Sequence, residues 1–320
     1  MNRTLIIARK EFKDHVSDHT FLLCFATLLI VMVGGALFMI QLVQYQNFRT
    51  ASGPYLIEED AIWKHYDYLF TEIVTGHLSS LGALLAVAMS INAIQKERVD
   101  GSLRVLMSYP IYRDDLFMGK LIGGALVLSL VAIVSMVISF SLLVFYLSIP
   151  LTIDFLIRII FTTLIGIMLL VFFLCIGMVV SSFLSDTSSI LLILILIVAV
   201  LRYETYNVLL VTGVNLLSYF GVRLPKPGFY HRGWFRSVWN DPFYRNVCRI
   251  SPIESYLKLS ESLFHFGWEY EWTPFGTDFT LFSFQDQLLK SLDLVAVQIV
   301  FTLVAVAACY IVSTRRELCP

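Results

Sequence analysis

The chain has 320 residues, of which 58% are hydrophobic and only 15% are charged, and its mean hydropathy is +0.77. These values exclude a water-soluble globular protein, because a soluble domain of this length needs a charged, hydrated surface. The formal net charge of −1 gives no basic excess for a nucleic-acid partner. We therefore expect a membrane protein whose surplus apolar side chains face lipid.

Residues 1–19 are expected to form an interfacial amphipathic helix on the cytosolic face of the membrane. Four apolar residues recur there at helical spacing: Leu5, Ala8, Phe12 and Val16. The other side of the same helix carries charges: Arg9, Lys10, Lys13 and Asp14. A frayed polar tail is the alternative. A full-length apolar span follows, so we expect the segment to be retained rather than cleaved as a signal peptide.

Six apolar segments predict six transmembrane helices, because a bilayer core about 30 Å thick needs roughly 20 apolar residues in a helix. They cover residues 20–43, 74–94, 121–147, 155–183, 188–201 and 292–313. The runs are continuous rather than alternating, which indicates an all-α polytopic membrane protein and not a barrel. The fifth segment is short, and only a continuation through 203–217 would lengthen it.

Lysine and arginine residues gather in three places: the N-terminal segment, the segment after the second span, and the C-terminus. The loop 44–73 carries only Arg49 and Lys64. By the positive-inside rule, both termini are predicted to lie in the cytosol of a multi-pass protein of the cell membrane.

Residues 96–120 hold nine charged side chains between two apolar spans. Asp100 and Gly101 predict a break, after which Leu103, Leu106 and Met107 share one side of about two helical turns. Pro110 ends that helix, because the residue before a proline is driven away from helical geometry. Asp114 and Asp115 suit the first turn of the next helix. The pattern favours a short cytosolic helix across the foot of two spans; an ordinary charged connector is the alternative.

This segment resembles the "ER..GTL..LL..P.SR.....GK" signature of ABC exporter permeases of the type-two family, which includes permeases of nitrous-oxide-reductase maturation and of multidrug export. The matching residues are Glu97, Gly101, Ser102, Leu103, Leu106, Pro110, Arg113, Gly119 and Lys120. Ser102 replaces the usual threonine and Tyr112 a serine. The spacing agrees throughout, and the segment follows the second span, as in that family.

The resemblance implies a coupling helix within residues 95–120 that docks in a groove of a separate ABC ATP-binding subunit, present in two copies. The residues expected to dock are Glu97, Arg98, Gly101, Leu103, Leu106, Met107, Pro110 and Arg113. ATP and Mg would be bound by that partner, since Gly119 and Lys120 are followed by Leu121 and the chain has no phosphate-binding loop. The resemblance also implies a second copy of the permease.

The chain is thus expected to comprise the interfacial helix 1–19, spans one to five within 20–202, an extended extracytoplasmic insertion 203–290, and the sixth span and tail 291–320. In the insertion, Ser251, Pro252 and Glu254 predict the start of an amphipathic helix near 251–265. An aromatic and arginine-rich stretch, 228–246, suits the headgroup layer better than an extracytoplasmic partner or substrate contact. In the turn 181–189, Ser185 or Asp186 is expected to cap the following helix.

The sequence offers few candidates for catalytic or metal-binding residues. The sequence lacks metal-ligand and nucleophile motifs, so we expect no metal site, no cofactor in this chain and no catalytic residue. Arg158, His77 and Asp293 lie near predicted outer ends, where their side chains are expected to snorkel. Two hypotheses remain: a permease subunit of an ATP-driven exporter, and a membrane anchor or scaffold without transport of its own.

Overall fold

The structure is a computed structural model that describes residues 3–51, 75–99, 113–147, 153–184, 186–201, 251–264 and 284–315. These residues are helical apart from short turns, and they contain no strand. The helices are α1 (Arg3–Ser17), α2 (His19–Ala51), the π-helical η2 (Leu78–Gly82), α4 (Ala83–Val99), α6 (Arg113–Leu147), α7 (Ile153–Phe183), α8 (Thr187–Leu201), α12 (Pro252–Phe264), α13 (Phe284–Lys290) and α14 (Leu292–Arg315). The expected all-helical class is confirmed for this part of the chain.

Four of these helices are long and apolar enough to cross a membrane. The spanning stretches are His19–Phe38, Asp115–Tyr146, Ile153–Phe183 and Leu292–Val312. They confirm four of the six predicted spans. The other two predicted spans correspond to the shorter apolar helices Leu78–Ile91 and Ser188–Ala199. The 15 residues of α8 rise only about 22 Å, less than a bilayer core. The count of six therefore stays a prediction.

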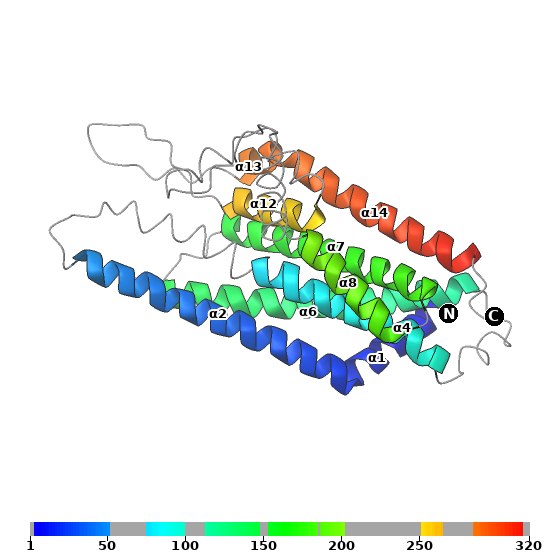
Figure 1. The fold of residues 1–320 in the computed structure, drawn as a ribbon. Helices are drawn as coiled ribbons and strands as arrows, with labels where there is room; N and C mark the ends of the chain where they lie inside the picture. Colours follow the sequence, from blue (N-terminus) through cyan, green and yellow to red (C-terminus); the bar gives the residue numbers. More distant parts are fainter. Residues whose placement is uncertain are drawn as a thin grey trace, which may run out of the picture.

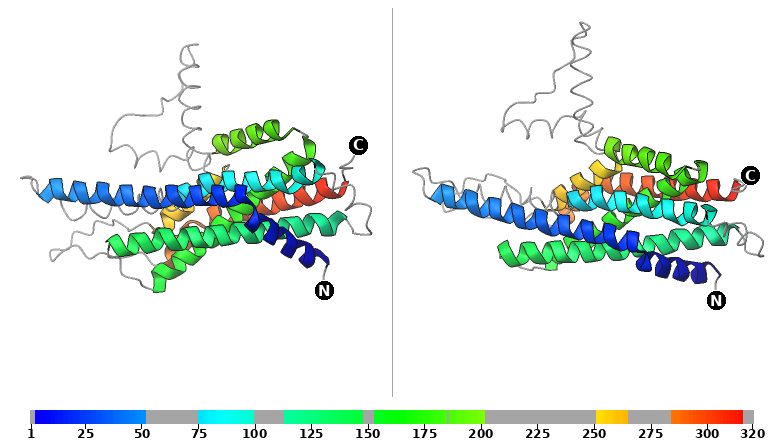
Figure 2. Two further views of the ribbon diagram at one scale, coloured as in Figure 1. Left: turned by 90° about the horizontal axis from the view of Figure 1, so that it is seen from below. Right: turned by 60° about the horizontal axis from the view of Figure 1, so that its bottom comes forward.

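The long helices lie side by side in one elongated bundle (Figure 1). Both chain termini lie at one end of this bundle, which we call the terminal end, while α12 and α13 lie toward the opposite, distal end. Helix α1 turns out of the line of α2 (Figure 2). Asp18 makes this bend: its backbone N–H bonds the His15 carbonyl at 3.2 Å, and its carboxylate accepts the Thr20 N–H at 3.2 Å. Asp18 thus ends α1 and caps α2.

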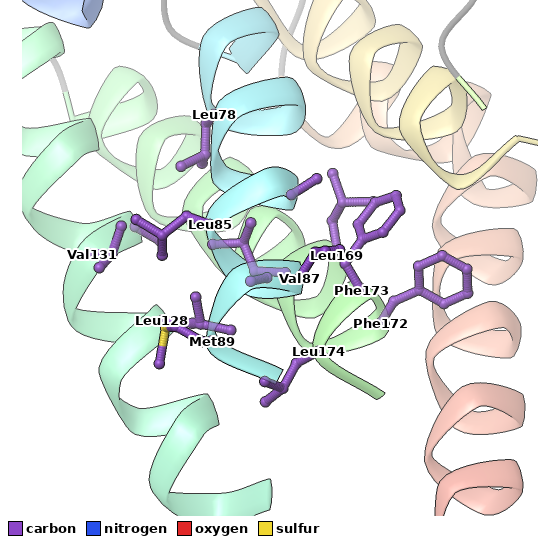
Figure 3. Close-up of a cluster of buried hydrophobic side chains, with 14 of the residues drawn as sticks. Leu78, Leu85, Val87, Met89, Leu128, Val131, Leu169, Phe172, Phe173 and Leu174 are labelled. Atoms are coloured by element: carbon purple, nitrogen blue, oxygen red, sulfur yellow. The ribbon is translucent and has the colours of Figure 1, made fainter. Parts of the chain in front are cut away.

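The core of the bundle lies between α4, α6 and α7 (Figure 3). Its labelled side chains are Leu78, Leu85, Val87, Met89, Leu128, Val131, Leu169, Phe172, Phe173 and Leu174. Small residues let these helices approach closely. A Cβ placed on Gly177 of α7 would lie 2.7 Å from the Ser90 Cβ of α4. Close backbone approach at small residues is the usual basis of helix packing in membranes, where lipid removes most of the hydrophobic drive.

Helix α12 confirms the helix predicted near 251–265, and Pro252 is its first residue. The Ser251 hydroxyl accepts the Glu254 N–H at 3.3 Å, as expected of a capping serine. Its environment is a finding of the tertiary structure, because α12 packs against α7, α14 and η2, and both Tyr256 and Leu263 are fully buried. Of the predicted insertion 203–290, residues 203–250 and 265–283 lie outside the described residues.

Candidate functional site: the joint between α1 and α6

We call residues 95–120, which are expected to couple the chain to a partner, the coupling segment. It begins in α4 and ends in α6, and these ends of the two helices lie at the terminal end of the bundle (Figure 1). Glu97 and Arg98 are in the last turn of α4, and Arg113 is the first residue of α6. The other residues expected to dock lie outside the described residues: Gly101, Leu103, Leu106, Met107 and Pro110. What the structure describes next to them in the chain is the joint between α1 and the first turns of α6.

Glycines at the start of α6 allow α1 to lie directly on its backbone. A Cβ added to Gly119 would lie 2.6 Å from Ile7 Cγ2 and 3.1 Å from the Thr4 carbonyl oxygen. A Cβ added to Gly123 would lie 2.9 Å from the Ala8 carbonyl oxygen. Gly119 and Gly123 are four residues apart, so they occupy one face of α6 and form a groove of bare backbone for α1.

A buried ion pair fastens α1 in this groove. Lys120 Nζ donates to Glu11 Oε1 at 2.9 Å, and the two side chains are only 4% and 9% exposed. One turn earlier, the Thr4 hydroxyl donates to Asp115 Oδ1 at 2.7 Å. Removing one partner of a buried pair leaves a charge without compensation, which typically costs about 3–5 kcal/mol. Loss of either Glu11 or Lys120 alone should therefore destabilise the contact between α1 and α6.

His15 extends the polar face of α1 by one more turn. Its Nε2 atom lies 3.9 Å from Glu11 Oε2, and its side chain is buried. Burial lowers the pKa of His15 below its ordinary value, and the cation of Lys120 lowers it further, while Glu11 opposes both effects. The imidazole is thus held neutral near pH 7 within a joint that already contains one cation.

The face of α1 that packs on α6 is not the apolar side predicted to lie on the membrane. On that apolar side Ala8 is buried, Phe12 and Val16 pack at the edge of the core, and the Leu5 side chain is 56% exposed. The side chains toward α6, most of them small or polar, are those of Thr4, Ile7, Ala8, Glu11 and His15. Apolar periodicity cannot find a glycine-lined groove, because that groove accepts short and hydrogen-bonding side chains. The spacing of Gly119 and Gly123 was the available signal.

The turn between α7 and α8 was predicted to hold a second helix cap, and Asp186 is confirmed in that role. Its Oδ2 accepts the Ser189 N–H at 3.0 Å and the Ser189 hydroxyl at 2.6 Å. These two bonds lower the pKa of Asp186, the side-chain bond most. Because α7 runs back from the distal end, this turn lies at the terminal end together with α1 and the start of α6.

Arg158 does not snorkel from the protein as expected. Its side chain is 4% exposed, Nε donates to Asp154 at 2.7 Å, and the guanidinium also bonds the Leu263 carbonyl of α12. A buried guanidinium is stable where carboxylate and carbonyl oxygens satisfy its donors. Arg158 therefore ties α12 to α7 at the distal end.

Comparison with known proteins agrees with this architecture. The family described as "ABC-2 family transporter protein" matches residues 5–318, which is nearly the whole chain. No curated protein matched the chain. The family match includes the coupling segment, the helices that flank it and α1. With its apolar bundle and four helices able to span a bilayer, the chain belongs to the ABC-2 transporter family, as an integral membrane permease component.

Proposed function

We propose that this chain is the membrane-spanning subunit of an ATP-driven exporter and that it takes up the force of ATP hydrolysis through residues 95–120. The observation that carries the proposal is the joint between α1 and the first turns of α6, the helix in which residues 95–120 end. ATP and Mg are bound by a separate ABC ATP-binding subunit. Two such subunits work with two copies of this chain in the cell membrane, and both termini face the cytosol.

The arrangement of the helices allows a movement of the coupling segment to be transmitted to α6, α1 and α2. The coupling segment continues into α6 through Arg113 without another connector. Any displacement of the segment acts on the first turns of α6, where the Glu11–Lys120 pair holds α1. Helix α1 leads through the bend at Asp18 into α2. One docking event at the segment can therefore move two membrane helices as a unit.

The docking surface is assigned to the residues predicted from the sequence. Leu103, Leu106 and Met107 form its apolar face, and Gly101 and Pro110 bound the short helix. Glu97, Arg98 and Arg113 supply polar contacts at its two ends. Apolar anchors surrounded by polar contacts are the common anatomy of a protein interface.

The test is co-purification of the tagged chain, in lipid nanodiscs, with the ATP-binding subunit retained from its native membrane. Leu106→Asp places a charge in the apolar face and is expected to lower the recovered ATP-binding subunit at least tenfold. Glu97→Ala is expected to have a smaller effect in the same direction. Ser108→Asp adds the same charge on the side of the predicted helix away from that face, and it serves as the matched control. Equal recovery with Leu106→Asp and Ser108→Asp would overturn the docking assignment.

A membrane anchor or scaffold would also hold an ATP-binding subunit, so binding alone does not separate the two hypotheses. A permease is expected to change the turnover of the bound ATPase. That change should disappear with Lys120→Met alone, which leaves Glu11 buried without its partner and loosens α1 from α6. An ATPase rate unaffected by this chain would favour the anchor.

A further inference from the structure

Four buried side-chain polar atoms along one seam of the bundle have no hydrogen-bond partner. Across the described part of the chain, six buried side-chain polar atoms are unpartnered. Four of them belong to three helices that meet at the distal half of the bundle: Thr162 Oγ1 of α7, Tyr256 Oη and Ser260 Oγ of α12, and Gln298 Nε2 of α14. Each of these side chains is at most 1% exposed.

Two contacts set the register of α12 against α7. The Arg158 guanidinium bonds the Leu263 carbonyl, and the Tyr256 hydroxyl lies 3.0 Å from the position of a Cβ on Gly166. The helices are therefore antiparallel. Ser260 is one turn from Tyr256, and Thr162 is midway between Arg158 and Gly166, so Ser260 and Thr162 lie level with each other.

Gln298 of α14 lies about one turn farther along the seam. The Thr302 hydroxyl contacts the Met168 carbonyl at 3.4 Å, and Phe301 packs on Phe172 at 5.9 Å between ring centroids. Helices α7 and α14 run parallel, so these contacts place Gln298 near the height of Gly166, the glycine next to the Tyr256 hydroxyl. The Gln298 Oε1 accepts the Ser255 hydroxyl of α12 at 3.1 Å, while its Nε2 has no partner.

The hydroxyls of Thr162 and Ser260 differ from nearby serine and threonine hydroxyls in their hydrogen bonding. Buried serine and threonine residues in helices usually bond a carbonyl of the preceding turn. Thr163 bonds the Ile159 carbonyl at 2.7 Å, and Ser291 bonds the Gln287 carbonyl at 2.9 Å. Thr162 and Ser260 make no such bond. These two buried hydroxyls therefore lack the partner that their neighbours find within their own helices.

We propose that α7, α12 and α14 enclose an internal hydration site, in which ordered water bridges Thr162, Tyr256, Ser260 and Gln298. A buried water makes about three hydrogen bonds to protein groups that would otherwise lack partners, and this seam offers three hydroxyls and an amide donor. Water both donates and accepts, so it satisfies this mixed set, and unlike an ion it brings no charge into the apolar bundle. The site lies about 14 Å along α7 from its first residue, at the depth of the apolar core.

Radiolytic hydroxyl-radical labelling of the full chain in nanodiscs tests the proposal directly. A radical formed from bound water labels the side chains that touch it, whatever their exposure to bulk solvent. Tyr256 is expected to take up oxygen from ¹⁸O-labelled water at millisecond exposures. Phe173, which is fully buried in the apolar core, is the internal control and should stay unmodified. An unlabelled Tyr256 would overturn the proposal.

Stability measurements give a second test, because the sign of the effect separates the alternatives. Deleting a buried hydroxyl that truly lacks a partner stabilises the fold, whereas deleting one bonded to water destabilises it. Tyr256→Phe and Ser260→Ala are each expected to raise the unfolding equilibrium constant roughly two- to tenfold. Thr163→Val is the matched control for loss of a bond within a single helix. A lower unfolding constant in Tyr256→Phe would show a bare hydroxyl and refute the hydration site.

Discussion

Replacing Gly123 with alanine should loosen α1 from α6 by adding a single methyl group. The new Cβ would lie 2.7 Å from Glu11 Cβ and 2.9 Å from the Ala8 carbonyl oxygen, where 3.4 Å is the lower bound of ordinary contact. Both atoms are fixed to the backbone of α1 and cannot rotate away, so α1 has to retreat by about 0.7 Å to restore ordinary contact. That retreat stretches the 2.9 Å bond between Lys120 and Glu11.

Overpacking of this kind costs about 1–3 kcal/mol, and the better helix propensity of alanine returns at most about 1 kcal/mol. We expect a net loss of about 1–2 kcal/mol in α1 docking, equivalent to roughly a tenfold rise in the undocked population. Hydrogen exchange of residues 3–17 in nanodiscs measures that population, because undocking exposes the amides of α1 to water.

Alanine substitutions at two other glycines serve as controls for the exchange measurement. A Cβ on Gly34 of α2 meets nothing within 4 Å, so Gly34→Ala should leave exchange in α1 unchanged. A Cβ on Gly124 would lie 3.0 Å from Leu174 Cδ2, the mobile end of a side chain, and should have a small effect that does not reach α1. Exchange in α1 that is the same for Gly123→Ala and Gly34→Ala would refute the packing argument.

Three further predictions concern charged groups. Lys120→Met leaves Glu11 buried without its partner and should destabilise the chain by about 3 kcal/mol in detergent unfolding. The double variant with Glu11→Leu should recover most of that stability. Additive effects of the two substitutions would contradict the pairing. Docking of α1 should weaken as the pH falls through 6.5, because burial lowers the pKa of His15 and the undocked imidazole takes up the proton that the docked one rejects. His15→Gln should abolish that dependence in exchange measurements, and an unchanged pH profile would rule out His15. Arg158→Leu removes the bond to the Leu263 carbonyl and should raise amide hydrogen exchange in α12 while α1 stays protected. An unchanged exchange rate in α12 would show that Arg158 does not hold α12 on α7.

The outline of the fold and the place of the coupling segment follow from sequence because they depend on local properties. Apolar runs long enough for a bilayer mark α2, α6, α7 and α14, since lipid selects them by length and composition alone. The caps at Ser251 and Asp186 were readable for a similar reason, because a cap is settled within four residues. Residues 95–120 resemble a coupling segment in their spacing, and both that role and the docking residues stay a prediction.

Partners distant in the chain were decided by tertiary structure alone. Glu11 was assigned no role by the apolar pattern of α1, and only the approach of α6 reveals its bond to Lys120, 109 residues away. Arg158 was expected at a lipid interface, yet α12 folds back from residue 252 onward to bury it. Hydrophobic periodicity reports which side of a helix avoids water. It does not report which groove receives that side, because glycine grooves and buried polar pairs are defined only once two helices are in register.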